Sequence, residues 1–225
     1  MIVHVEQVLD AERVGRFRAA LDAADWADGA VTAGYQSALA KRNLQLPEGS
    51  ETARALGHEV LEALGRSLIF QAAALPQAIF PPLFSRYTPG HDFGSHVDNA
   101  WRPLPGGGRI RTDLSATLFL SEPDSYDGGE LVIEDMAGDR AIKLAAGDMI
   151  LYPSTSLHHV APVTRGERLA VVFWAQSLVA AADRRALLFD LDIAIQSLRP
   201  KLGDEDPALI TLTGSYHNLL RMWSA

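Results

Sequence analysis

A succession of short apolar runs between residues 78 and 177 is the feature that most constrains the fold of this chain. The runs are rich in Val, Ile, Leu and Phe and lie at 79–80, 83–87, 112–120, 130–133, 141–144, 148–152, 159–163 and 168–175. Turn signals that contain glycine separate several of them, at 127–129, 137–139, 146–147 and 164–166. Short strands at a spacing of roughly 8–12 residues are typical of a sandwich or barrel. We therefore predict a two-sheet jelly roll.

Helical patterns flank this β region on both sides. Asp10 is a candidate N-cap for a helix that runs to about residue 25, and Ser50 is one for a second helix. That second helix carries an apolar stripe at Leu56, Val60, Leu61 and Leu64. A further helical piece ends before Pro76, and helical patterns return after residue 181.

These patterns divide the chain into three parts. The first, at 1–77, is an N-terminal support region whose helices pack on the sheet, and the second, at 78–177, is the β core. The third is a C-terminal helical extension at 178–225. The sequence thus predicts a mainly β fold with helical flanks.

Composition narrows the chemistry that is open to such a fold. The chain has no cysteine, which excludes disulfides, zinc-thiolate sites and a cysteine nucleophile, so any metal must be held by His, Asp or Glu. The net charge is −8 and no basic block is present, so nucleic acid is not an expected partner. No apolar run reaches the roughly 18 residues that a membrane span needs, and no signal peptide is recognisable. We therefore expect a cytoplasmic protein without a membrane partner.

The triplet His96-Val97-Asp98 is a candidate metal site. In extended backbone, side chains two residues apart point to the same side, so His96 and Asp98 can face a common point. A second histidine would complete a set of two imidazoles and one carboxylate. Such a set holds a divalent metal on one side and leaves other positions open, as in non-haem Fe(II) oxygenases.

The second histidine must come from elsewhere in the chain, and the adjacent pair His158 and His159 begins a β run. If 164–166 is a three-residue hairpin loop with Gly166 in the left-handed conformation, Val163 pairs with Glu167 and Pro162 with Arg168. Arg168 then shares its face with His158 and not with His159. The slot between them is roughly 13 Å long. A five-carbon diacid could chelate the metal at one end and meet the guanidinium at the other. The alternative for Arg168 is a surface position paired with a neighbouring glutamate.

With these residues in place, the chain resembles the Fe(II)- and 2-oxoglutarate-dependent dioxygenases of the prolyl 4-hydroxylase type, and specifically the bacterial PKHD-type hydroxylases. Similar segments accompany the triplet, at 86–90, 127–131, 147–154 and 157–168. The resemblance implies a double-stranded β-helix core, catalytic Fe(II) on His96, Asp98 and His158, and 2-oxoglutarate on Arg168. It also implies ascorbate as a reductant, O2 as a reactant, and hydroxylation with release of succinate and CO2. Asp98 favours hydroxylation over halogenation, because halogenating centres free that position for halide.

One departure from the family pattern concerns the far end of 2-oxoglutarate. In related animal enzymes a tyrosine helps to hold the distal carboxylate, and Phe119 in the corresponding run has no hydroxyl. Thr117, on the same face, is a candidate substitute, as is Ser115, and Tyr87 is a third candidate for binding the cofactor. A buried threonine bonded to a neighbouring strand is an equally simple interpretation.

The sequence leaves open an alternative function and the identity of the substrate. The main alternative function is a non-catalytic jelly-roll or cupin-like module that binds a metal or ligand. The substrate is a small molecule, a siderophore or a peptidyl residue, and residues 99–108 are expected to form a rim that contacts it. Apolar positions in the C-terminal helices are compatible with a homo-oligomer.

Overall fold

The computed structural model describes residues 1–32, 40–104, 106–134 and 138–224. Its larger sheet runs in the order β1 (Val3–Val5), β14 (Met149–Pro153), β10 (Leu114–Phe119), β17 (Arg168–Ser177), β6 (Leu83–Tyr87), β4 (Leu44–Gln45) and β2 (Ala27–Asp28), and β5 (Pro76–Ile79) also pairs with β17. The smaller sheet runs in the order β13 (Arg140–Ile142), β12 (Leu131–Ile133), β15 (His158–Val160), β7 (Asp92–His96) and β3 (Lys41–Arg42). All of these pairs are antiparallel, which confirms the two-sheet jelly roll.

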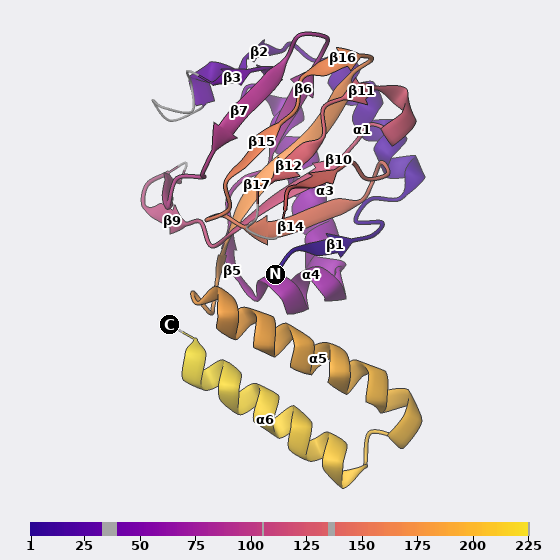
Figure 1. Ribbon diagram of the computed structural model, residues 1–225, viewed down its shortest axis with the longest axis vertical. Helices are drawn as coiled ribbons and strands as arrows, with labels where there is room; N and C mark the ends of the chain where they lie inside the picture. Colours follow the sequence, from indigo (N-terminus) through magenta and orange to yellow (C-terminus); the bar gives the residue numbers. More distant parts are fainter. Residues whose placement is uncertain (33–39, 105, 135–137, 225) are drawn as a thin grey trace.

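Three helices cover the outer face of the larger sheet: α1 (Ala11–Asp22), α3 (Glu51–Arg66) and α4 (Leu68–Ala74) (Figure 1). Asp10 and Ser50 cap α1 and α3 as expected, each accepting a hydrogen bond from a backbone N–H three residues later. Apolar contacts bind these helices to the sheet, because the Phe17 and Phe84 rings lie 6.4 Å apart and the Phe70 and Phe173 rings 6.2 Å apart.

Side chains on β10 and β17 alternate between the helices and the interior of the jelly roll. On β10, Leu114, Ala116 and Leu118 belong to the core under the helices, whereas Ser115, Thr117 and Phe119 face inward. On β17, Leu169, Val171 and Phe173 belong to that same core, whereas Arg168, Val172 and Trp174 face inward. The polar inward positions are therefore available to a site between the two sheets.

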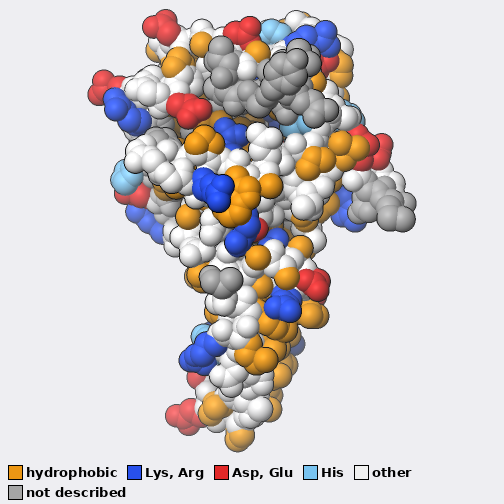
Figure 2. Space-filling model, turned by 90° about the vertical axis from the view of Figure 1, so that its left-hand side faces the viewer, with side chains coloured by type: hydrophobic (Ala, Val, Ile, Leu, Met, Phe, Trp, Pro, Cys, Tyr) orange, Lys and Arg blue, Asp and Glu red, His pale blue; other side chains and the backbone are white. Residues whose placement is uncertain are grey.

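The C-terminal helices α5 (Ala182–Leu202) and α6 (Pro207–Trp223) form an antiparallel hairpin that projects from the β body (Figures 1 and 2). Leu75, Val179 and Leu188 are buried at its base. Arg185 is buried there too and donates hydrogen bonds of 2.7 Å to the carbonyls of Val179 and Ala180. Among the described residues, no helix is long and apolar enough to cross a membrane. The division of the chain at residues 77 and 177 stays a prediction.

The predicted hairpin at 164–166 is wrong. The strand β16 (Val163–Arg165) pairs with β11 (Asp127–Gly128), and β17 pairs instead with β10, β6 and β5. Arg168 consequently lies opposite Tyr87 and not Pro162. The left-handed conformation expected at Gly166 is present, with φ of 71°. The physical reason for the difference is that this turn links strands of two different sheets, a non-local choice that the turn residues do not specify.

The segment at 99–108 is more regular than the rim that we expected. The strands β8 (Trp101–Pro103) and β9 (Arg109–Arg111) pair as a two-stranded antiparallel hairpin. Pro105 lies outside the described residues. The remaining short helical turns are η1 (Gly29–Thr32) and η2 (Pro123–Ser125).

Candidate metal centre and cofactor pocket

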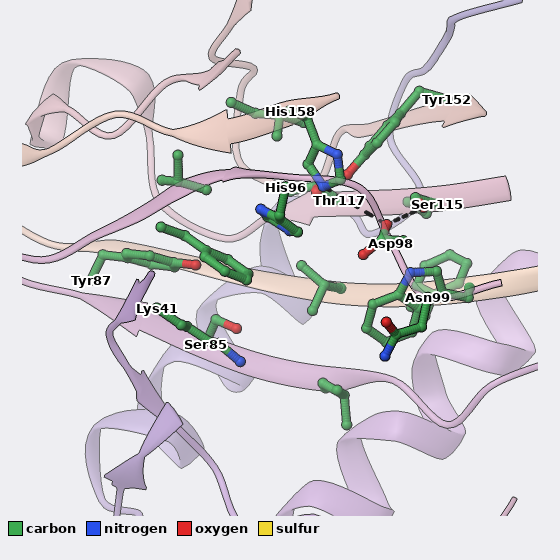
Figure 3. A pocket seen from close by; sticks show the side chains of 18 of the residues that line it. Lys41, Ser85, Tyr87, His96, Asp98, Asn99, Ser115, Thr117, Tyr152 and His158 are labelled. Atoms are coloured by element: carbon green, nitrogen blue, oxygen red, sulfur yellow. Dashed lines mark hydrogen bonds and ion pairs between the residues drawn. The ribbon is translucent and has the colours of Figure 1, made fainter. Parts of the chain in front are cut away.

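His96, Asp98 and His158 converge between the two sheets (Figure 3). One potential ligand atom from each lies within 4.8 Å of those from the other two. His96 is the last residue of β7 and lies directly opposite His158, the first residue of β15, and the two imidazole centroids are 4.3 Å apart. Asp98 follows two residues later, just after the end of β7. The register of β7 and β15 therefore selects His158, whereas His159 lies 3.5 Å from Glu134.

Hydrogen bonds orient both imidazoles toward this common point. The Nδ1 atom of His96 lies 2.8 Å from the Gly94 carbonyl, and that of His158 lies 3.0 Å from the Ser156 carbonyl. A carbonyl oxygen only accepts, so each Nδ1 carries a proton, and in a neutral imidazole with this tautomer the lone pair is on Nε2. Burial, followed by the neighbouring His158, lowers the pKa of His96 to about 4, so this imidazole is neutral near pH 7. Neutral imidazole is the form that binds a metal.

The carboxylate of Asp98 is held by Ser115, which is itself bonded to Ser154. The Ser115 hydroxyl donates a hydrogen bond of 2.5 Å to Oδ2 of Asp98. Ser115 in turn lies 2.8 Å from the hydroxyl of Ser154, and both serines are buried. Two imidazole nitrogens and one carboxylate oxygen on one side, without thiolate, form a donor set that fits Fe(II).

A cavity that is open to solvent contains this triad and extends toward Arg168. Arg168 is 1% exposed and lies near the rings of Tyr87 and Phe119, with its guanidinium carbon 5.2 and 5.4 Å from the ring centroids. Its Nε and Nη2 atoms are buried, and neither finds a hydrogen-bond partner among the described residues. A buried guanidinium with unsatisfied donors is costly unless an anion completes it, so the site fits a carboxylate ligand.

Comparisons with known proteins agree with this geometry. A family model described as the 2OG-Fe(II) oxygenase superfamily matches residues 82–176, and one described as the PKHD-type hydroxylase C-terminal domain matches residues 183–225. A PKHD-type hydroxylase from Methylobacterium nodulans is 58% identical over 225 residues, and another from Burkholderia thailandensis is 59% identical. Each alignment covers 100% of this chain and 99% of the relative. This chain belongs to the PKHD-type hydroxylases. Its family is therefore that of the Fe(II)- and 2-oxoglutarate-dependent hydroxylases, and the resemblance seen in the sequence is confirmed.

Solved structures support the fold. The crystal structure of a Pseudomonas putida prolyl-4-hydroxylase has a TM-score of 0.53 and 21% identity, and covers 78% of this chain and 92% of its own. The 2-oxoglutarate-dependent epimerase SnoN from nogalamycin biosynthesis has a TM-score of 0.54 and 19% identity, and covers 79% of this chain and 78% of its own. One of these proteins is named a hydroxylase and the other an epimerase, so the shared fold alone does not identify a reaction or a substrate.

The Tyr87 and Thr117 hydroxyl groups expected near Arg168 differ in their surroundings in this PKHD-type hydroxylase. Tyr87 is buried, lines the cavity and lies opposite Arg168 in the β6–β17 register. Thr117 also lines the cavity, but it shares a hydrogen bond with Tyr152, as the simpler interpretation of this residue allowed. Burial raises the pKa of both tyrosines, so both phenols stay protonated and able to donate.

Sequence reasoning missed two groups near the site. The hydroxyl of Tyr126 is buried close to the guanidinium of Arg168, whose charge acts on it. Lys41, on β3, lines the cavity with its ammonium 5.6 Å from the Phe93 ring centroid. No local motif marks either residue, because each reaches the site only through the pairing of distant strands.

The other histidines lie elsewhere. His91 lies in the turn before β7, where its Nδ1 accepts a hydrogen bond from the Thr88 backbone N–H. His58 is on the exposed side of α3 beside Glu62, and His4 bonds Asp148. None of these three lines the cavity.

Proposed function

We propose that His96, Asp98 and His158 hold Fe(II), and that Arg168 binds the distal carboxylate of 2-oxoglutarate. The reaction is hydroxylation of a substrate C–H bond with O2, with release of succinate and CO2. The observation that supports this proposal is one cavity lined both by a facial set of metal ligands and by a buried guanidinium whose Nε and Nη2 find no partner among the described residues. Bound Fe(II) would supply the O2 activation that no protein side chain can perform.

The protein's own groups orient the reactants and exclude water. The Gly94 and Ser156 carbonyls fix the imidazoles, and Ser115 fixes the Asp98 carboxylate through Oδ2, the oxygen that also lies 3.8 Å from Nε2 of His158. Phe93 stacks on His96 at 3.7 Å between ring centroids and shields it. We assign Tyr87 and Thr117 as cofactor-binding residues on the walls of the co-substrate slot, and Tyr126 as a further hydroxyl within reach of the distal carboxylate.

The test is succinate release from 2-oxoglutarate with Fe(II) present. We expect His96→Ala to abolish turnover, whereas the matched loop variant His91→Ala stays close to wild type. Arg168→Ala should raise the KM for 2-oxoglutarate about 100-fold, because losing one partner of a buried charge pair costs roughly 2–5 kcal/mol. Turnover that survives His96→Ala would show that the triad is not the metal site.

We also propose that ascorbate keeps the iron reduced between turnovers. In this proposal, ascorbate prolongs turnover without changing the initial rate. A progress curve that is the same with and without ascorbate would contradict it. The cytoplasmic location stays a prediction, which fractionation of cells that contain the tagged protein can check.

A homo-oligomer is a further proposal for the α5–α6 hairpin. Leu187, Ile210 and Met222 are 59%, 58% and 74% exposed on it, and Figure 2 shows hydrophobic side chains along the projecting part. Burying such side chains against a second copy is favourable. Sedimentation velocity should show a dimer that Leu187→Glu with Ile210→Glu dissociates, and a monomeric wild-type protein would exclude it.

A further inference from the structure

The cavity carries more positive charge than its metal and co-substrate need. Among the described residues, its lining includes the cations Lys41, Arg102 and Arg168 and one carboxylate, Asp98. Under the proposed function, the two positive charges of Fe(II) offset the two negative charges of 2-oxoglutarate, so the lining keeps its excess of cations. The whole protein has a net charge of −8, so this local excess is not a reflection of composition.

Arg168 and Arg102 lie near opposite ends of the strand β17. Arg168 is the first residue of β17, opposite Tyr87. Arg102 stacks on Trp174, which lies six positions further along β17, roughly 20 Å away, opposite Ser115. Ser115 bonds the metal ligand Asp98, so Arg102 lies at the metal end of the cavity, and Arg168 at the co-substrate end.

The guanidinium of Arg102 is fixed but incompletely bonded. Its central carbon lies 3.9 Å from the Trp174 ring centroid and 4.6 Å from that of Phe80. Ring stacking holds the face of a guanidinium and leaves its in-plane N–H donors free for a ligand. The Nε atom is buried without a hydrogen-bond partner, and Arg102 makes no ion pair with any described residue. The carboxylate of Asp98 and, less strongly, that of Glu48 act on it electrostatically; Asp98 is a metal ligand under the proposed function, and Glu48 does not line the cavity.

The partner strand offers a natural contrast. Arg109, on β9, lies 4.8 Å from the Trp101 ring centroid, but it is exposed and does not line the cavity. If arginine–ring stacking served only to stabilise the β8–β9 hairpin, an exposed arginine such as Arg109 could provide it. Arg102 instead directs a cation inward, at the cost of burying it.

We propose that Arg102 determines substrate specificity, and that the substrate carries a carboxylate near the C–H bond that is hydroxylated. This inference rests on the proposed function, because it assigns Arg168 to 2-oxoglutarate and leaves Arg102 for the second anion. The planar guanidinium fork matches a carboxylate in two parallel hydrogen bonds. Lys41, on β3 of the smaller sheet, adds positive charge to the cavity as a whole.

The experiment uses the full chain loaded with Mn(II) and saturating 2-oxoglutarate under nitrogen. Paramagnetic Mn(II) speeds the relaxation of protons on any molecule that binds close to it. The probes are benzoate and phenylacetate, each compared with its neutral amide, and the methylene protons of 2-oxoglutarate are observed in the same spectra. We expect relaxation enhancement for both carboxylates and little for the amides. Arg102→Gln should weaken carboxylate binding about tenfold or more, and the matched Arg109→Gln should not.

The outcomes separate this inference from the proposed function. If 2-oxoglutarate itself is not relaxed in the wild-type protein, the proposed function fails, and this inference fails with it. If 2-oxoglutarate is relaxed but carboxylates and amides behave alike, or Arg102→Gln changes nothing, only the role of Arg102 is overturned. A carboxylate signal that falls as 2-oxoglutarate rises would place the probe on Arg168 and also overturn it. Unchanged 2-oxoglutarate relaxation in Arg102→Gln shows that the variant keeps its fold.

Discussion

The Ser115 hydroxyl donates a hydrogen bond of 2.5 Å to Asp98 and so holds the orientation of its carboxylate. A ligand carboxylate that is free to rotate binds a metal less well than one that is held. We predict that Ser115→Ala lowers Mn(II) affinity roughly 10- to 100-fold, as measured by anaerobic titration. Ser121→Ala is the control, since Ser121 is also buried and bonded, to Glu167 and Leu169, but does not line the cavity. Equal affinity in Ser115→Ala and wild type would contradict the role.

Arg168 lowers the folding stability of the ligand-free protein, and the same side chain provides a binding site for an anion. Without an anion, its buried and unsatisfied donors destabilise the fold. We predict that Arg168→Met raises the free energy of unfolding by about 1–3 kcal/mol in urea without 2-oxoglutarate, and removes the stabilisation that 2-oxoglutarate gives to wild type.

Arg185 provides the matched control for that prediction. It is as buried as Arg168, but its guanidinium donates to the carbonyls of Val179 and Ala180. Arg185→Met should therefore destabilise the protein, because two buried carbonyls lose their donor. A loss of stability in both methionine variants would mean that Arg168 is structural.

At the scale of elements, the turn between β16 and β17 determines where the cofactor arginine lies. Gly166 has φ of 71°, and a Cβ atom there would lie 2.2 Å from the Ser125 carbonyl oxygen. The chain crosses here from the β11–β16 pair into the larger sheet, two residues before Arg168.

We predict that Gly166→Ala costs roughly 2 kcal/mol or more in the free energy of unfolding, because the left-handed conformation and the contact with Ser125 both oppose a side chain. Gly90→Ala should cost only roughly 1 kcal/mol, because Gly90 has φ of 89° but open space around it. Urea unfolding of both variants measures the difference. Similar losses would show that the Ser125 contact relaxes at no cost.

At the scale of the whole molecule, an acidic protein surrounds a cationic cavity. Lys41 contributes to that cavity, and burial, followed by the charge of Arg102, lowers its pKa to about 8. Its ammonium donates a hydrogen bond of 2.6 Å to Gln45. The carboxylates that act on Lys41 in the opposite direction are those of Glu48, Asp28 and Asp98.

We predict that 2-oxoglutarate binds a few-fold more weakly at pH 9 than at pH 7, because Lys41 loses its charge as the pH rises through about 8. Lys41→Met should bind more weakly at pH 7 and show a flatter profile, measured by anaerobic calorimetry with Mn(II)-loaded protein. The pH dependence of folding stability has the opposite direction. The folded-state pKa lies below the ordinary 10.5, so the contribution of Lys41 to stability rises with pH between about 8 and 10.5. An equal pH profile in wild type and Lys41→Met would exclude Lys41 as the titrating group.

Local chemistry made much of this molecule predictable from its sequence. Capping identified Asp10 and Ser50, because a side chain that accepts from a backbone N–H three residues later is a short-range interaction. The period-two alternation of side chains brought His96 and Asp98 to one side without knowledge of the partner strand. Turn glycines marked the ends of strands, and Gly166 has the conformation that was expected of it.

Only the tertiary structure decided which strands meet. The hairpin predicted at 164–166 is wrong because strand pairing is non-local, and His158 lies opposite His96 through a register that no short segment encodes. The sequence placed Arg102 only within the segment 99–108 that was expected to contact the substrate, and its position at the metal end of the cavity follows from its stacking on Trp174, 72 positions away. Alternation along a strand is a property of the local backbone, whereas the neighbours that give a side chain its charge environment and its role are assembled by the whole fold.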